Sequence, residues 1–160
     1  MRPFLTLVST IAIIFVGLSA CAAQAINGPQ PRLNQSPLTI ETASGAVEFT
    51  VEFADDPVEV RTGMMFRQEI EDFEGMLFDM GRVREAAFWM RNTLIPLDII
   101  FIEEDGTIFR IAADAVPQTD DPIYSYGPVR GVLEIGGGRA AELGLEEGDL
   151  VRHPLFENTP

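Results

Sequence analysis

The chain has 160 residues and a formal net charge of −14 at pH 7, because 25 acidic residues outnumber 11 basic ones, all of them arginine. Such acidity argues against nucleic acid as a partner, since nucleic-acid binding depends on neutralising phosphates. A single cysteine, Cys21, excludes an internal disulfide. The chain is long enough for one domain after an N-terminal signal, and too short for two.

Residues 1–20 have the pattern of a signal peptide. Arg2 gives a short basic start, residues 4–18 are almost entirely apolar, and small residues follow. The apolar stretch is short for a membrane-spanning helix, which needs about 20 such residues. We therefore expect an exported protein.

Residues 18–21 (Leu-Ser-Ala-Cys) resemble the lipobox of bacterial lipoproteins, in which the cysteine is acylated and becomes the new amino terminus. Ordinary signal-peptidase cleavage after Ala25 is the alternative. Lipidation would explain why an exported chain carries one unpaired cysteine. Because Ala22 follows the cysteine, the resemblance favours the outer membrane. The expected protein is thus an outer-membrane lipoprotein on the periplasmic side, bound to the membrane through Cys21.

The rest of the chain is expected to form a tether over residues 21–37, one domain over residues 38–156 and a short tail over residues 157–160. The tether prediction rests on three prolines among polar residues without an apolar period, which is typical of a semi-rigid, solvated segment. A domain of about 120 residues buries roughly two-thirds of its unfolded surface, which is enough to fold without disulfides.

The first part of the domain shows clear strand and helix signals. Residues 46–53 alternate apolar and polar side chains, which predicts a strand with one buried face. Residues 38–42 precede it as a second strand, joined by a tight turn. The Asp-Pro pair at residues 56–57 predicts the start of a short helix, with Gly63 as its left-handed stop.

Further strands are predicted where short apolar segments alternate with turn signals. They comprise residues 75–80, 86–90, 97–102, 107–115, 129–135 and 150–153, with a helical turn at 139–143 and a proline-containing loop at 116–128. The helical pieces are too short to support βαβ crossovers. We therefore expect a mainly β domain, a single antiparallel β-sandwich or a partly closed barrel with one or two short helices.

Several sequence blocks together resemble the family catalogued as domain of unknown function 192. The main blocks are residues 61–67 (RTGMMFR), 75–78 (GMLF), 88–93 (FWMRNT) and 95–102 (IPLDIIFI), followed by shorter matches at 105–106, 132–134 and 148–149. The resemblance covers about residues 39–151. It implies a compact, mostly β fold, often behind a signal peptide, and it implies no settled activity.

Metal and nucleophile chemistry have little support in the sequence. His153 is the only histidine, and neither an HExxH nor a CxxC motif is present, which excludes a common zinc site. Five methionines between residues 64 and 90 could offer thioethers to Cu(I), but they come from separate strands and are interpreted as core packing. No metal, cofactor or catalytic residue is assigned, and His153 is expected in the core or at an edge.

Asp98 is the most informative carboxylate, because it lies in an otherwise apolar strand, where a charge needs a partner. In a structural interpretation it accepts backbone N–H groups of the preceding turn. An arginine could serve instead, and the candidates are Arg61, Arg67, Arg91 and Arg130. In a functional interpretation Asp98 forms the floor of a ligand pocket. The candidate ligand-binding residues are Arg67, Trp89, Asn92, Asp98 and Glu134.

Two functions remain open at this point. The first is a non-catalytic envelope module that binds a small ligand, a glycan or a protein partner, and the absence of a catalytic motif favours it. The second is a carboxylate-dependent enzyme acting on a cell-envelope glycan, with Asp98 and Glu134 as its acid and base. The two are distinguished by geometry, because the enzyme needs both carboxyl groups across one cleft.

Overall fold

The structure is a computed structural model that describes residues 26–159, so the expected signal peptide and Cys21 lie outside the described part of the chain. The elements, in chain order, are β1 Gln35–Thr42, β2 Gly45–Ala54, α1 Pro57–Thr62, β3 Glu74–Phe88, β4 Leu97–Ile102, β5 Ile108–Ala115, β6 Ile123–Gly136, α2 Arg139–Leu143, β7 Leu150–Arg152 and the 3-10 turn η1 Pro154–Phe156. Within residues 26–159, no helix is long and apolar enough to cross a membrane.

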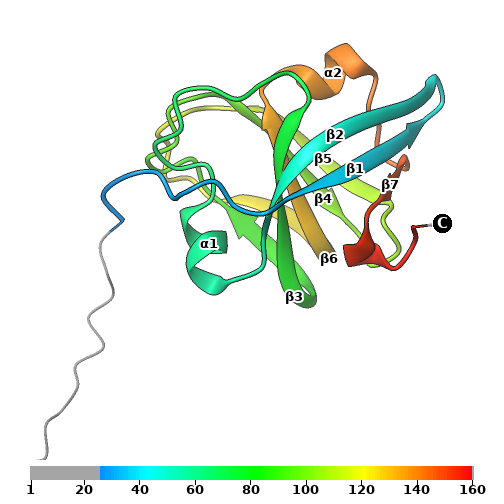
Figure 1. Cartoon of the computed structure of the whole chain (residues 1–160), viewed down its shortest axis with the longest axis horizontal. Helices are drawn as coiled ribbons and strands as arrows, with labels where there is room; N and C mark the ends of the chain where they lie inside the picture. Colours follow the sequence, from blue (N-terminus) through cyan, green and yellow to red (C-terminus); the bar gives the residue numbers. More distant parts are fainter. Residues whose placement is uncertain (1–25, 160) are drawn as a thin grey trace, which may run out of the picture.

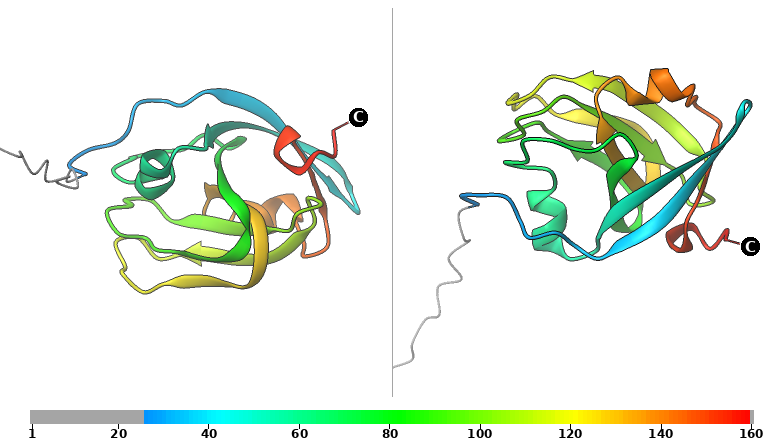
Figure 2. Two further views of the ribbon diagram at one scale, coloured as in Figure 1. Left: turned by 90° about the horizontal axis from the view of Figure 1, so that it is seen from below. Right: turned by 45° about the horizontal axis from the view of Figure 1, so that its top comes forward.

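All seven strands belong to one sheet, in the order β5-β4-β6-β3-β2-β1-β7 (Figure 1). The sheet curls on itself, as the two views in Figure 2 show. A single bridge between Thr107 and Leu150 joins the region before β5 to β7, which links the two edges of the sheet. The prediction of a mainly β domain is confirmed, and its form is the partly closed barrel.

One strand pair departs from the expected antiparallel arrangement. β2 and β3 are parallel, with Thr50 opposite Glu74 and Ala54 opposite Phe78. The expectation that the helical pieces exclude a crossover is wrong here. The segment between the strands, residues 55–73, is long enough to return the chain, although α1 has only six residues.

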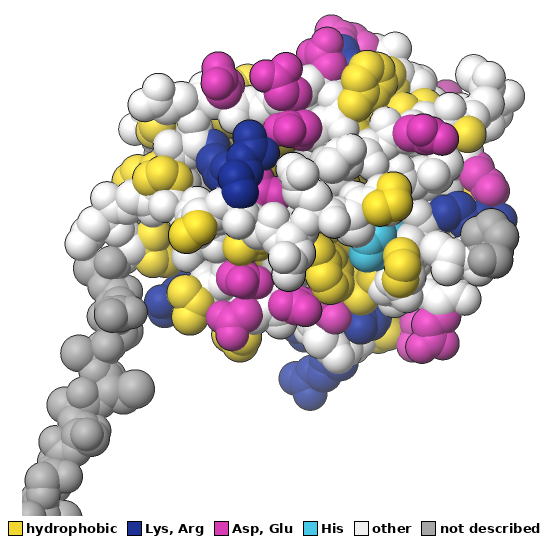
Figure 3. All heavy atoms as spheres, in the orientation of Figure 1, with side chains coloured by type: hydrophobic (Ala, Val, Ile, Leu, Met, Phe, Trp, Pro, Cys, Tyr) yellow, Lys and Arg dark blue, Asp and Glu magenta, His cyan; other side chains and the backbone are white. Residues whose placement is uncertain are grey.

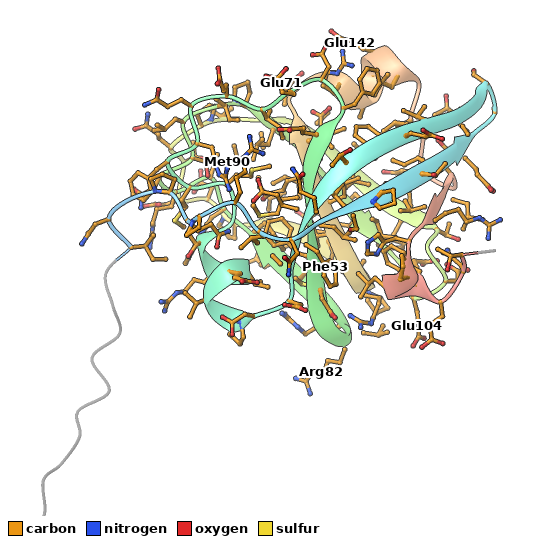
Figure 4. The ribbon with its side chains drawn as sticks, in the orientation of Figure 1. Phe53, Glu71, Arg82, Met90, Glu104 and Glu142 are labelled. Atoms are coloured by element: carbon orange, nitrogen blue, oxygen red, sulfur yellow. The ribbon has the colours of Figure 1, made fainter. Side chains whose placement is uncertain are left out.

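The strands β3 and β6 are longer than their local sequence signals predict. β3 is one strand that bends through register shifts between Asp79 and Arg84 and again after Glu85, where two strands and a turn were expected. Figure 4 shows Arg82 at the outer end of this bend, pointing away from the domain. Residues 123–128 were expected in a loop, but they pair with the second half of β3. Cross-strand pairing therefore overrides the proline and glycine signals at both places.

Two hydrophobic clusters occupy the two faces of the sheet. One cluster takes side chains from all seven strands, among them Ile40, Val51 and Val151, and fills the barrel. The other lies on the opposite face, where α1 and its following loop cover side chains such as Met76 and Phe101. Every residue of β4 is buried, because this strand contributes to both clusters.

Residues 30–34, just before β1, contact the domain, although they were expected in a solvated tether. The amide of Gln30 donates to the carbonyl oxygens of Glu59 and Gly63, at 3.3 and 3.0 Å. The backbone N–H of Leu33 donates to the Glu52 carboxylate at 2.8 Å. β1 itself begins before the expected boundary at residue 38. The tether is therefore shorter than expected, since residues 30–37 find partners on α1 and β2.

The C-terminal residues also form hydrogen bonds with the domain. Asn158, expected in a tail, donates its side-chain amide to the carbonyl of Val151 at 2.7 Å. His153 is buried, as expected, and its Nδ1 accepts from the backbone N–H of Leu155. Its Nε2 therefore carries the proton and donates to Ser36 Oγ at 2.9 Å. Burial lowers the pKa of His153, which keeps the ring neutral.

Candidate functional site

A pocket of about 190 Å³ opens between α1 with its following loop and the bent strand β3. Apolar and polar side chains both line it, and its mouth carries two exposed arginines. The apolar side chains are Val60, Met64, Met65, Phe78, Met80, Ala86, Ala87, Phe88 and Trp89. The polar ones are Arg61, Thr62, Arg84, Thr93 and Glu134.

The alternation of β3 places its apolar side chains in this pocket. Met76, Phe78 and Met80 share one face of the strand, because successive side chains point to opposite sides. Met76 lies opposite Glu134 of β6, so the Glu134 side chain points to the same face. Gly63 brings the chain after α1 close to this face: its φ is 47°, and a Cβ there would lie 3.3 Å from the Phe78 ring.

Glu134 is an unusual residue for such a place. Glu134 is only 4% exposed to solvent. Among the described residues, its Oε2 has no hydrogen-bond partner. Burial raises the pKa of Glu134 to about 8, since the apolar surroundings disfavour the charged form. The carboxyl group is therefore mostly protonated at neutral pH.

A second glutamate on the same face shows the contrast. Glu52 of β2 lies beside Met76, which in turn lies opposite Glu134, so the two carboxyl groups flank one methionine. Glu52 is also buried, but it accepts from Arg67 at 2.9 Å, from Arg32 at 3.0 Å and from one backbone N–H. The fold thus supplies a full set of donors to one carboxylate and leaves its neighbour without any for Oε2.

Asp98 lies on the other face of the sheet. It is fully buried, and it accepts from the backbone N–H groups of Asp114, Gly138 and Ala140 at 2.8, 3.0 and 2.7 Å. The prediction that Asp98 accepts backbone N–H groups is confirmed, although the donors are not those of the preceding turn. The expected pairing with an arginine is wrong, because these three backbone groups occupy the carboxylate.

The expected cooperation of Asp98 with Glu134 is also wrong. Asp98 lies opposite Ile135, whereas Ile99 lies opposite Glu134. Directly opposed residues point to the same face, and neighbours along a strand point to opposite faces. The two carboxyl groups are therefore on opposite sides of the sheet and cannot act across one cleft.

The remaining predicted ligand-binding residues have different places. Trp89 lines the pocket mouth and is 41% exposed, with the Arg91 guanidinium 4.5 Å from its ring centre. Arg67 donates to the Glu52 carboxylate and does not line the pocket. Asn92 is not among the lining residues: its carbonyl accepts from the N–H of Phe66 at 2.8 Å, and its side-chain amide lies 3.9 Å from Met65 Sδ. Of the five predicted residues, the structure brings Trp89 and Glu134 together in the pocket.

Sequence reasoning missed most of the pocket lining. The methionines were interpreted as core packing, and Met64, Met76, Met80 and Met90 indeed belong to one hydrophobic cluster. Met90 is labelled in Figure 4 near the end of β3. Met64, Met65 and Met80 nevertheless also face the pocket. Within residues 26–159, no group of three or more His, Cys, Asp or Glu side chains is placed to hold a metal ion.

Comparison with known proteins agrees with this fold. The family model DUF192, described as an uncharacterized ACR, matches residues 39–153. The chain belongs to the DUF192 family. The resemblance expected from the sequence blocks is thereby confirmed, and Glu134 and Trp89 lie inside the matched DUF192 region.

Two solved structures resemble this DUF192 protein over most of its length. A Sinorhizobium meliloti protein, named as a candidate transcription regulator, is 38% identical with a TM-score of 0.76, over 79% of this chain and 98% of that one. A Novosphingobium aromaticivorans protein of unknown function is 45% identical with a TM-score of 0.76, over 82% and 94% of the two chains. Comparison with curated proteins gives no match.

Proposed function

We propose that this DUF192 protein is an exported, non-catalytic module that binds a small molecule in the Glu134 pocket. The observation that carries the proposal is a buried carboxyl group without a partner for Oε2 among residues 26–159, set in a pocket where most of the lining side chains are apolar. A buried polar group without a partner costs about 1–3 kcal/mol, and such costs are commonly retained where they serve a function. A pocket lined mainly by apolar side chains, with a few convergent polar groups, is the usual form of a small-molecule site.

Binding is favoured over glycan hydrolysis by the number of carboxyl groups at the pocket. Glycoside hydrolysis usually needs two carboxyl groups on the two sides of the scissile bond. Glu134 is the one acidic residue among those that line the pocket, and Asp98 faces the other way. The Sinorhizobium relative is named as a candidate transcription regulator. We do not propose nucleic acid as a ligand of this protein, because the chain is strongly acidic.

Export and anchoring form the second part of the proposal. The signal-like residues 1–20 and the lipobox-like residues 18–21 support a lipoprotein held at the outer membrane through Cys21. Residues 30–34 then attach to α1 and β2, so the pocket would lie a short distance from the anchor. The partners that we expect are the membrane, through the lipid, and a small envelope ligand.

The anchor is tested by intact mass spectrometry of protein extracted from membranes. We expect a mature chain that begins at Cys21 and carries the added mass of acyl groups. Cys21→Ser should remove this mass and release the protein from the membrane fraction. An unmodified amino terminus at Ile26 would contradict lipidation and would support ordinary cleavage after Ala25.

The pocket is tested by Trp89 fluorescence, because Trp89 is the only tryptophan and lines the mouth. An engineered apolar cavity of about 150 Å³ binds benzene, so benzyl alcohol and benzylamine are suitable probes for a pocket of about 190 Å³. We expect a saturable change in emission with at least one of them. Ala86→Leu fills the pocket and should weaken this binding about tenfold or more, at a stability cost of about 1–3 kcal/mol.

The matched control is Ala113→Leu, the same change at an exposed position in β5. Its binding should equal that of the wild type, and thermal melts establish that both variants are folded. If neither probe gives saturable binding, or if Ala86→Leu leaves binding unchanged, the proposed pocket function is wrong.

A further inference from the structure

We infer that the ligand of this pocket is a small organic ammonium ion, which brings its positive charge to Glu134 and its apolar body to the methionine and aromatic walls. This inference rests on the proposed function and names the chemical class of its ligand. It depends on what the floor of the pocket can accept, on what its walls can stabilise and on the charge around it.

The floor offers an acceptor, and its hydroxyl donors are already used. Thr62 Oγ1 donates to the carbonyl of Val58 at 2.8 Å, and Thr93 Oγ1 points to the carbonyl of Arg91 at 3.5 Å. Glu134 Oε2 is the buried polar atom of the pocket left without a partner among the described residues. An ammonium group has three N–H donors and no acceptor, so it complements the ionised Glu134 carboxylate, whereas an anionic group would depend on the single O–H of the protonated acid and on the exposed Arg61 and Arg84 at the mouth.

The aromatic and methionine side chains that line the pocket also favour a positively charged ligand. Phe78 and Phe88 form an edge-to-face pair with ring centres 5.1 Å apart, and Trp89 stands at the mouth. The faces of aromatic rings carry negative charge density and attract ammonium groups, most strongly where water is excluded. The thioethers of Met64, Met65 and Met80 are polarizable and pack against an apolar body of irregular shape.

The charge of the molecule acts in the same direction. The net charge is −14, and acidic side chains are spread over the face seen in Figure 3, so the field of the domain attracts cations. Arg61 and Arg84 at the mouth oppose this attraction, but both are exposed and therefore screened by salt. Glu134 acts in an apolar interior, where a charge pair is screened much less.

Binding of an ammonium ion changes the protonation state of Glu134. Without a cation beside it, the carboxyl group is mostly protonated at neutral pH, because burial raises its pKa to about 8. An ammonium ion stabilises the carboxylate, so its binding releases the carboxyl proton to solvent and leaves one ion pair. A neutral ligand would bind without this release. Proton release on binding therefore distinguishes a cation from a neutral molecule.

The test uses three isosteric probes, benzylamine, benzyl alcohol and benzoate, and the full-length mature protein in detergent. By Trp89 fluorescence and calorimetry at about pH 8, we expect benzylamine to bind at least about tenfold more tightly than benzyl alcohol. Benzoate should not bind measurably. Benzylamine affinity should rise between about pH 6 and pH 9, and calorimetry in buffers of different ionisation enthalpy should detect the released proton.

Glu134→Gln should remove the preference for the amine and the proton release, so that benzylamine binds no more tightly than benzyl alcohol. Glu48→Gln, the same change at an exposed position in β2, should behave like the wild type. If benzyl alcohol binds the wild type as tightly as benzylamine, or if Glu134→Gln keeps the preference, the ammonium inference is wrong while the pocket function stands. If no probe binds any of these proteins, the pocket function fails and the inference fails with it.

Discussion

Replacing Asp98 by asparagine is expected to lower the free energy of unfolding by about 3–5 kcal/mol. The Asp98 carboxylate accepts from three backbone N–H groups, those of Asp114, Gly138 and Ala140. Each hydrogen bond to a charged group contributes about 1.5–3 kcal/mol. Asparagine keeps one acceptor oxygen, but it turns an NH₂ group toward at least one backbone N–H in a fully buried place.

Chemical denaturation of the wild type and Asp98→Asn measures this loss. Asp121→Asn is the matched control, because it makes the same change at an exposed position, where substitutions usually alter stability by less than about 0.5 kcal/mol. Hydrogen exchange should also show the amides of Gly138 and Ala140 opening more readily in Asp98→Asn. An unchanged unfolding midpoint would contradict the anchoring role of Asp98.

The second large effect is expected at Glu134, where the charged form destabilises the fold. The folded-state pKa is about 8, against 4.5 for the free side chain. Between these values the unfolded chain releases its proton and the folded chain keeps it. The contribution of Glu134 is therefore most favourable below the unfolded pKa, and it is lost as pH rises through the folded pKa.

One pKa unit corresponds to about 1.4 kcal/mol, so the wild type should lose on the order of 3–5 kcal/mol from this group between about pH 4.5 and pH 8. Glu134→Gln cannot titrate and keeps the shape of the side chain. Its stability relative to the wild type should therefore increase with pH over this range by a similar amount. Above about pH 8 it should be the more stable protein.

Urea unfolding of both proteins at a series of pH values tests this expectation. The difference between the two proteins is the informative quantity, because the other acidic residues titrate equally in both. Glu48→Gln, at an exposed position, should show a nearly constant difference from the wild type. A constant difference for Glu134→Gln as well would mean that the Glu134 carboxyl group is not held in an apolar environment.

Where residues near in sequence decide the structure, the sequence alone was sufficient. The helix α1 occupies the predicted residues, because Asp56 caps its first turn and Gly63 ends it with a positive φ. The helical turn at residues 139–143 was likewise predicted correctly, and so was the alternation of β2 as far as Thr50, whereas Glu52, expected on the wet face, is buried. Capping and side-chain alternation are properties of a few consecutive residues, so they can be read without knowledge of the fold.

Pairing between distant strands was decided only by the tertiary structure. β3 continues through Gly81 because residues 123–136 of β6 pair with both of its halves. The pocket likewise joins Met64 after α1, Met80 of β3 and Glu134 of β6, which come from separate parts of the chain. No local pattern indicates that these side chains meet.

Asp98 and Glu134 show most clearly which features the sequence predicts and which only the tertiary structure decides. The sequence marks Asp98 as a charge in an apolar strand, and it offers Glu134 as a candidate ligand-binding residue and as a possible acid/base partner of Asp98. The register of β4 against β6 places Ile99, and not Asp98, opposite Glu134. Because side chains alternate between faces, this register sends Asp98 to three backbone donors and Glu134 to a pocket where Oε2 has no partner among residues 26–159. The sequence alone thus marked Asp98 as a charge that needs a partner, and the tertiary structure made it a structural anchor and left Glu134 facing a pocket.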